Sequence, residues 1–198
     1  MSTSPVPLTG SSGRAPAPRV ASGRLPSAAE RRAECADFED RLTAELMTAV
    51  GGARRRALRD GDRQIDTAHL LHSLVEADPE TAAVLDEGDR LARVLGYLVQ
   101  RSIGYGLRWQ RAAEETGSGL PVVRGGGNGA AGWSPAAATA LAGAFERAVR
   151  RGDRRVRGLD LLAALAADPG NRAAEVLRRA GVDALALTAR IEEPSQQV

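Results

Sequence analysis

The stretch that decides the fold lies in the first half of the chain, and a second copy of it returns in the second half. It reads Ile65-Asp66-Thr67-Ala68-His69-Leu70-Leu71-His72-Ser73-Leu74-Val75 and recurs as Val156-Arg157-Gly158-Leu159-Asp160-Leu161-Leu162-Ala163-Ala164-Leu165-Ala166. From Ile65 to Val156 the offset is 91 residues, and the same offset pairs Thr43 with Ser134 and Gly61 with Gly152. Self-similarity on this scale is typical of two supersecondary units that stabilise each other by packing. We therefore expect two related halves with pseudo-twofold symmetry.

The composition favours helices over sheets. Hydrophobic residues make up 43% of the chain, but aromatic residues only 3%, so the core must consist mainly of Ala, Leu and Val. Small side chains let helix axes approach closely, whereas a sheet would use more β-branched and aromatic residues. The sequence thus predicts an all-α protein of two tandem four-helix repeats, with eight core helices.

Changes in composition along the chain predict its domain boundaries. The first segment is rich in Pro, Ser and Gly, and a later one contains many Gly residues, which prevent long regular elements. A Gly-Gly-Gly run at 125–127 has no Lys-Ser/Thr after it and no strand before it, which favours a linker over a phosphate loop. We expect a disordered tail (1–27), a first repeat (28–103), a Gly-rich linker (104–132), a second repeat (133–192) and a short tail (193–198).

Helix boundaries are indicated by caps and by apolar spacing. We expect one continuous helix from Phe38 to Leu58, preceded by a possible helix start after Ser27. Asp66 or Thr67 should cap the next helix, and Pro79 should open a short third one. Further helices are expected at 90–103, from Pro135 to Arg151, and at 158–166, 171–180 and 183–191.

No catalytic, metal or cofactor site stands out. The only two histidines, His69 and His72, stand three residues apart, but no third ligand in register completes a metal site. Cys35 lies before the repeat with no orienting partner, and no carboxylate pair suggests acid-base chemistry. We therefore predict that the protein is not an enzyme. No apolar run approaches the ~20 residues of a membrane span, and the N-terminal segment lacks a secretory pattern, so we expect no membrane association and a cytoplasmic location.

Arginine runs occur at equivalent positions of the two repeats and leave two interpretations open. They comprise Arg54 and Arg55 in the first repeat, and Arg150, Arg151 and Arg154 in the second. They could be solvated residues near helix C-termini, where positive charge is favourable, or a patch for an acidic partner or nucleic acid. The absence of interleaved aromatic residues disfavours nucleic acid. A nucleic-acid-associated regulator is kept as the alternative function.

Several motifs together resemble a known family. They are Ala53-x3-Ala57-x3-Gly61-x3-Ile65-Asp66-Thr67-Ala68-His69-Leu70-Leu71, Trp133-Ser134-Pro135 and Gly181-Val182-Asp183. In these motifs the chain, over about residues 38–192, resembles the N-terminal (Clp repeat) domain of Clp-type AAA+ unfoldases. The resemblance implies an eight-helix domain that docks adaptors and receives substrates.

The resemblance also implies a location for binding. It points to the groove between the repeats, where peptides and small cyclic ligands can dock, and the candidate groove residues are Phe38, Leu42, Ala68, Trp133 and Leu159. A plain core role for Trp133 is the competing interpretation. In one branch of the family a Glu near the start of the second helix of each repeat contacts phosphoarginine. Those two positions here are Ala68 and Leu159, which supply no negative charge and argue against phosphoarginine as the ligand.

The sequence contains no Gly-x4-Gly-Lys-Ser/Thr motif, so we expect a stand-alone form without the ATPase modules. The function we predict is a non-catalytic module that binds a protein, peptide or small ligand and modulates Clp-dependent proteolysis as an adaptor, a decoy or a ligand-sequestering protein. The expected partners are a Clp ATPase, its adaptors or substrates, or a small cyclic-peptide-like ligand.

Overall fold

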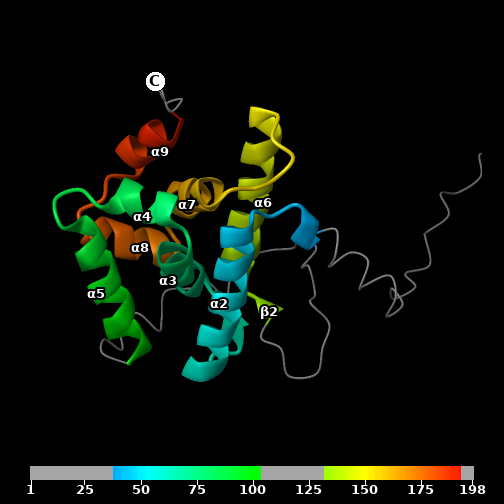
Figure 1. Cartoon of the computed structure of the whole chain (residues 1–198). Helices are drawn as coiled ribbons and strands as arrows, with labels where there is room; N and C mark the ends of the chain where they lie inside the picture. Colours follow the sequence, from blue (N-terminus) through cyan, green and yellow to red (C-terminus); the bar gives the residue numbers. More distant parts are fainter. Residues whose placement is uncertain (1–37, 104–131, 193–198) are drawn as a thin grey trace, which may run out of the picture.

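The computed structural model describes residues 38–103 and 132–192, and Figure 1 shows their arrangement. The expected tail at 1–27, the possible helix after Ser27, the linker up to residue 131 and the tail at 193–198 lie outside the described residues. The elements, in chain order, are α2 (Ala44–Asp60), β1 (Gln64–Ile65), α3 (Thr67–Ala77), α4 (Pro79–Leu85), α5 (Arg90–Ser102), β2 (Gly132–Trp133), α6 (Pro135–Arg151), α7 (Gly158–Ala167), α8 (Arg172–Arg179) and α9 (Ala184–Glu192).

The described elements confirm the predicted helical fold of two four-helix units, α2 to α5 and α6 to α9. Equivalent residues begin and end the first helix of each unit. The Thr43 hydroxyl accepts a hydrogen bond from Leu46 N–H at 3.3 Å, and the Ser134 hydroxyl accepts one from Ala137 N–H at 3.1 Å. Gly61 and Gly152 end these helices with φ of 74° and 79°, a conformation that glycine adopts without steric cost.

The prediction of one continuous helix from Phe38 to Leu58 is wrong. A short helical turn at 38–40 is followed by a break, and α2 begins only at Ala44. At the break Leu42 forms an isolated parallel bridge with Val156, and Thr43 N–H donates to Val156 O at 3.1 Å. The backbone cannot make this contact with the other repeat and remain helical, so the pairing ends the first turn.

Two short backbone pairings relate the repeats through the expected pseudo-twofold axis. The parallel strands β1 and β2 pair Ile65 with Trp133, and Ser134 N–H donates to Ile65 O at 2.9 Å. The offset of 91 residues converts this pair into Val156 and Leu42, which form the second bridge. Each repeat therefore presents the same two segments to the other, as a symmetric interface requires.

The central helices of the core are α3 and α7, the two copies of the decisive stretch. Every residue of α3 from Thr67 to Val75 is buried, and α7 is buried at almost every position. Helix α2 packs on α3, and helix α6 packs on α7. The largest fully buried side chains are mostly leucines, including Leu46, Leu70, Leu71, Leu74, Leu161, Leu162, Leu165 and Leu177. Within the described part of the chain, no helix has the length and apolar character that a bilayer crossing demands.

Candidate functional site

A pocket of about 770 Å³ opens where α4, the C-terminal end of α6, the start of α7 and α9 meet. We call it the arginine pocket, because it is lined by Arg147, Arg150, Arg151, Arg157 and Arg190. Its apolar lining comes from three of the four elements and includes Val84, Leu159 and Ile191. Its volume is in the usual range for ligand sites in proteins, which are mostly apolar with a few convergent polar groups.

Some of these arginines already have carboxylate partners. Arg147 Nη2 lies 2.9 Å from Glu192 Oε1, and Arg190 pairs with Glu87. The hydrogen bond from Arg190, with the positive charges of Arg190 and Arg90, lowers the pKa of Glu87. Glu87 and Glu192 are therefore engaged by cations of the same chain, whereas Glu80 lines the pocket without an ion pair in the described part of the chain.

Arg151 pairs with both Asp160 and Asp153, whereas Arg150 and Arg157 are less fully satisfied. Hydrogen bonding to the buried Asp160 raises the pKa of Arg151, which keeps its guanidinium charged. Arg150 makes no ion pair or hydrogen bond within residues 38–103 and 132–192. The Nε atoms of Arg147 and Arg157 are buried, and in the described part of the chain neither has a hydrogen-bond partner. The pocket thus retains donor capacity and positive charge.

The place of Arg157 at the N-cap of α7 explains why its side chain makes no capping hydrogen bond. Arg157 occupies the N-cap position but has no oxygen with which to accept a hydrogen bond from the helix. Asp160, in the first turn, instead accepts a hydrogen bond from Arg157 N–H at 2.9 Å. The Arg157 side chain is therefore free of any capping duty, and 41% of it is exposed.

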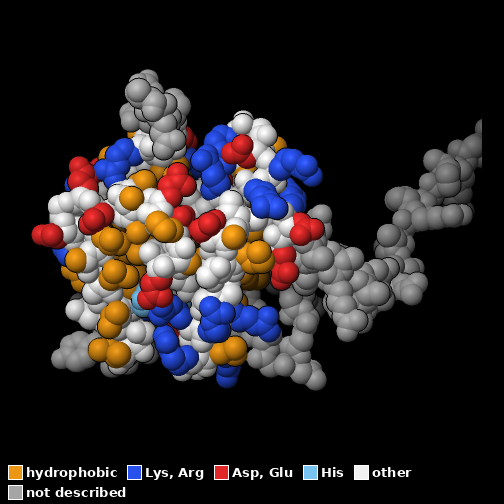
Figure 2. Space-filling view, viewed as in Figure 1, with side chains coloured by type: hydrophobic (Ala, Val, Ile, Leu, Met, Phe, Trp, Pro, Cys, Tyr) orange, Lys and Arg blue, Asp and Glu red, His pale blue; other side chains and the backbone are white. Residues whose placement is uncertain are grey.

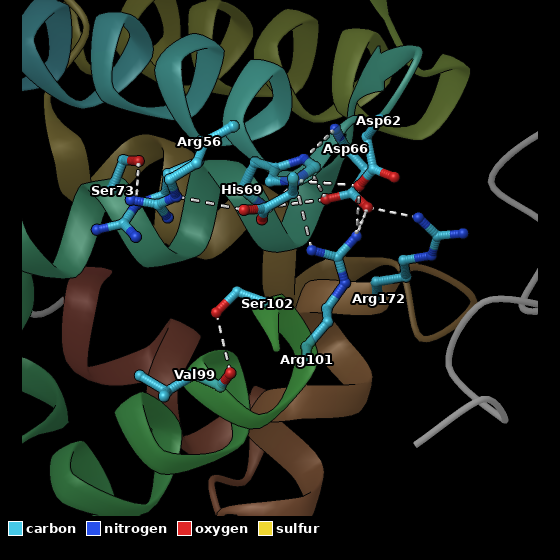
Figure 3. A network of polar contacts seen from close by, with 11 residues as sticks. Arg56, Asp62, Asp66, His69, Ser73, Val99, Arg101, Ser102 and Arg172 are labelled. Carbon is cyan, nitrogen blue, oxygen red and sulfur yellow. Dashed lines mark hydrogen bonds and ion pairs between the residues drawn. The ribbon is translucent and has the colours of Figure 1, made fainter. Parts of the chain in front are cut away.

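The equivalent residue in the first repeat is Asp66, and its side chain makes different contacts. Its carboxylate pairs with Arg101 of α5 and with Arg172 of α8, as Figure 3 shows. The Asp66 side chain is only 3% exposed. We call the group formed by Asp62, Asp66, His69, Arg101 and Arg172 the Asp66 network. Because Arg172 belongs to the second repeat, this network also holds the two repeats together.

Asp66 forms a capping box with His69. The Asp66 carboxylate accepts a hydrogen bond from His69 N–H at 2.9 Å, and His69 Nδ1 accepts one from Asp66 N–H at 3.1 Å. The neutral ring then carries its hydrogen on Nε2, which lies 3.3 Å from Asp62 Oδ2. Burial alone would raise the pKa of Asp66, but hydrogen bonding with His69 and the charge of Arg101 outweigh burial and hold that pKa well below its ordinary value.

Asp62, Asp66 and His69 also place three potential metal-ligating atoms within 4.8 Å of one another. The surrounding charges do not suit a dication, because Arg101 Nη2 lies 3.5 Å from Asp62 and both Arg101 and Arg172 pair with Asp66. These guanidinium groups already neutralise the carboxylates. The network is a structural ion-pair site, and we assign no metal to it.

The arginine pocket and the Asp66 network occupy equivalent places in the two repeats. Helices α6, α7, α9 and α4 surround the pocket, and their counterparts α2, α3, α5 and α8 surround the network. The 91-residue offset pairs Arg147 with Arg56 and Arg157 with Asp66. At the N-cap position the first repeat therefore has a carboxylate, Asp66, where the second has the guanidinium of Arg157.

Comparisons with known proteins agree with this arrangement. Residues 133–198 match the family model described as the Clp repeat (R) N-terminal domain. The chaperone protein ClpB of Rhodopseudomonas palustris is 30% identical over 152 residues, which are 77% of this chain and 16% of that protein. This chain carries a Clp N-terminal repeat domain. It spans about one sixth of the length of that curated relative.

Solved structures show the same fold for the Clp repeat domain. The N-terminal domain of the caseinolytic protease associated chaperone ClpD from Arabidopsis thaliana superposes with a TM-score of 0.55 at 19% identity, over 77% of this chain and 92% of that one. A structure from preliminary investigations of a malarial protein secretion system gives a TM-score of 0.57 at 17% identity, with the same coverage of 77% and 92%.

The five predicted groove residues of the Clp repeat domain do not form one surface. Leu42 and Ala68 are 2% and 1% exposed, so both side chains belong to the core. Phe38 packs on Phe145 with ring centroids 5.5 Å apart, and Trp133 is half-buried at the β1–β2 pairing. Leu159 differs from the rest, because it lines the arginine pocket.

The predicted basic patch is divided between two ends of the domain. Figure 1 shows α2 and α6 running in opposite directions, so Arg54 and Arg55 lie far from Arg150, Arg151 and Arg154. Figure 2 accordingly shows Arg side chains gathered in two places, near the C-terminal end of each helix. A nucleic-acid-binding surface would then have to be built from the arginines at one end of the domain only.

Sequence reasoning missed the residues that define both sites. Arg101 and Arg172 come from helices whose pairing with α3 no local pattern reveals, and Arg147 and Arg190 were not singled out. One signal was available, because the 91-residue offset already set Arg157 against Asp66. A reversal of charge at an otherwise repeated position indicates that the two copies differ in what surrounds it.

Proposed function

We propose that this Clp repeat domain is a non-catalytic, cytoplasmic protein-binding module that modulates Clp-dependent proteolysis. It engages a substrate, an adaptor or a Clp ATPase, and acts as an adaptor, a decoy or a ligand-sequestering protein. The observation that carries the proposal is the open arginine pocket, which lies on a rigid helical scaffold shared with domains of Clp chaperones.

Two features support binding in preference to catalysis. Within residues 38–103 and 132–192 the two histidines are both engaged, His69 in the capping box and His72 with Glu76 at 3.3 Å. Near the pocket Glu87 pairs with Arg190, which lowers the pKa of Glu87 and makes it a poor proton acceptor at neutral pH. What remains available is a shaped surface with hydrogen-bond donors.

The test is a degradation assay with a purified Clp ATPase, its peptidase and a fluorescent model substrate. Adding the full 198-residue chain should change the initial degradation rate in a dose-dependent way, because it competes for or delivers a binding partner. The direction of the change separates an adaptor from a decoy. The same titration with a Gly158→Ala variant should have a weaker effect, because a Cβ at Gly158 would lie 1.8 Å from Asp78 Oδ2 and destabilise the fold.

An unchanged degradation rate at saturating concentrations, together with no capture of Clp components by the immobilised chain, would reject this function. The nucleic-acid alternative is checked separately by a gel shift at low salt, where phosphate contacts are strongest. A salt-sensitive complex with duplex DNA, in the absence of any effect on proteolysis, would favour that alternative.

A further inference from the structure

We infer that the arginine pocket binds an acidic peptide segment of another protein, and that the chain has one such site although its fold is duplicated. The inference rests on the proposed binding function and names the chemistry of the ligand. Its basis is the contrast between Asp66, which pairs with two arginines at the start of α3, and Arg157, which takes the equivalent position beside a pocket lined by five arginines and three glutamates.

The backbone framework of the two places is the same, but the charge is not. Residues 56–69 contain three Arg and three Asp, whereas the equivalent residues 147–160 contain six Arg and two Asp. Two of the changes reverse the sign, from Asp60 to Arg151 and from Asp66 to Arg157. The second repeat therefore concentrates positive charge where the first is balanced.

In the first repeat the equivalent position holds a carboxylate bound by arginines. The Asp66 carboxylate sits between two guanidinium groups that reach it from α5 and α8, at the start of α3. Guanidinium groups and the first turn of a helix both favour an anion. Asp66 thus acts as a built-in ligand, and it closes this site to any external one.

In the second repeat no carboxylate stands at the position of Asp66, and the buried carboxylate of the first turn, Asp160, is already paired with Arg151. Arg157 replaces Asp66 and its Nε lies 3.8 Å from Asp153 Oδ2, Arg150 has no partner within the described residues, and the buried Nε atoms of Arg147 and Arg157 make no hydrogen bond there. A buried donor without an acceptor costs free energy, and a carboxylate entering the pocket would supply the acceptor. The pocket is therefore matched to an external carboxylate.

The apolar part of the pocket lining favours a peptide as the ligand. Val84, Leu159 and Ile191 provide an apolar surface beside the arginines, which suits aliphatic side chains next to acidic ones. Leu159 lacks the charge needed to receive a cationic group, and Glu87 and Glu192 are already paired with Arg190 and Arg147. A ligand that combines leucine-like and carboxylate side chains fits better than one that carries its own guanidinium.

The experiment uses the full chain and a fluorescein-labelled peptide with a Leu-Glu-Glu-Leu segment flanked by Gly and Ser. Fluorescence anisotropy should show saturable binding that weakens as salt is raised, because the contacts are charged. A peptide with Gln in place of both Glu residues should bind about tenfold more weakly or worse, since it offers no charged acceptor.

Matched variants locate the site. Arg150→Gln should weaken binding about tenfold, while Arg59→Gln, the equivalent change in the first repeat, should leave it unchanged. Arg157→Asp should abolish binding, because it gives the second repeat the internal carboxylate of the first. Circular dichroism and thermal melting establish that each variant is folded, and Arg150→Gln removes no contact that the described structure contains.

Three results would overturn the inference. They are equal affinity of the Glu and Gln peptides, wild-type affinity in Arg150→Gln, and displacement of the peptide by free phosphoarginine or duplex DNA at lower concentrations than by unlabelled peptide. Peptide binding that depends on Arg150 without any effect on proteolysis would retain the site and reject the proposed function. An effect on proteolysis that survives Arg150→Gln, with no peptide binding, would retain the proposed function and reject the site.

Discussion

The two repeats share a backbone fold but differ in the charge of the residue at the start of their second helix. In the first, the capped start of α3 carries Asp66, which draws in arginines from α5 and α8. In the second, the start of α7 carries Arg157, and a pocket remains between the same four kinds of helix. A duplicated fold can therefore give one copy a stabilising ion-pair network and the other the proposed binding pocket by changing a few charges, since the backbone pairing between the copies is unaffected.

The largest expected effect comes from removing the internal anion. Asp66→Ala should lower the free energy of unfolding by about 4 kcal/mol, because it removes the N-cap of α3 and leaves two arginines without their buried carboxylate. Urea denaturation followed by circular dichroism measures the change. The matched variant Arg157→Ala should shift it by no more than about 0.5 kcal/mol, as it removes no cap. Equal losses in the two variants would contradict the division of roles.

The next largest effect is expected at Gly158, the residue that follows Arg157. A Cβ at Gly158 would lie 1.8 Å from Asp78 Oδ2 and 2.9 Å from Thr81 Oγ1, so Gly158→Ala must displace a buried hydrogen bond between those side chains. We expect a loss of between about 3 and 4 kcal/mol in the same assay.

Gly96→Ala is its control. No atom lies within 4 Å of a Cβ at Gly96, and the residue is inside α5, so the substitution should stabilise the protein by up to about 1 kcal/mol. A Gly158→Ala protein as stable as wild type would mean that α4 and α7 are packed less closely than the structure shows.

A pH titration addresses His72, whose counterpart in the second repeat is Ala163. Burial, and then the charge of Arg56, lower the pKa of His72 from 6.5 to about 4. Because the folded value lies below the unfolded one, the contribution of neutral His72 is complete above pH 6.5 and is lost as the pH falls towards 4. The free energy of unfolding should drop by about 3 kcal/mol over this interval.

His72→Ala should flatten that part of the profile. Asp66 does not contribute there, because its pKa is held below the ordinary carboxyl range and its protonation begins to matter only as the pH falls below about 4. An unchanged slope in His72→Ala would assign the pH dependence to other groups.

The smallest effect is expected at Thr67, the counterpart of Gly158. Its hydroxyl accepts a hydrogen bond from Ala173 N–H at 3.0 Å, at the start of α8. Thr67→Ala should lower the free energy of unfolding by about 1 kcal/mol, the usual value for one such bond. A loss as large as that of Gly158→Ala would show that the contacts of Thr67 and Gly158 contribute equally to the free energy of unfolding.

Much of the fold could be predicted from local pattern. Asp66, Asp78 and Ser134 act as caps, and Gly61 and Gly152 end helices, as local pattern indicates, whereas the cap at Thr43 lies inside the segment predicted as one helix. The failure at Leu42 has a physical reason, because a backbone pairing with Val156, more than a hundred residues away, overrides the helical tendency of the segment.

By itself the sequence determined the helical class, the duplication and most helix ends, because periodicity and capping are properties of neighbouring residues. The tertiary structure alone decided that Arg101 and Arg172 converge on Asp66, that Leu42 and Ala68 are core residues, and that five arginines surround an open pocket. These outcomes depend on which helices meet across the pseudo-twofold axis, and no local spacing encodes the distance between groups on different helices.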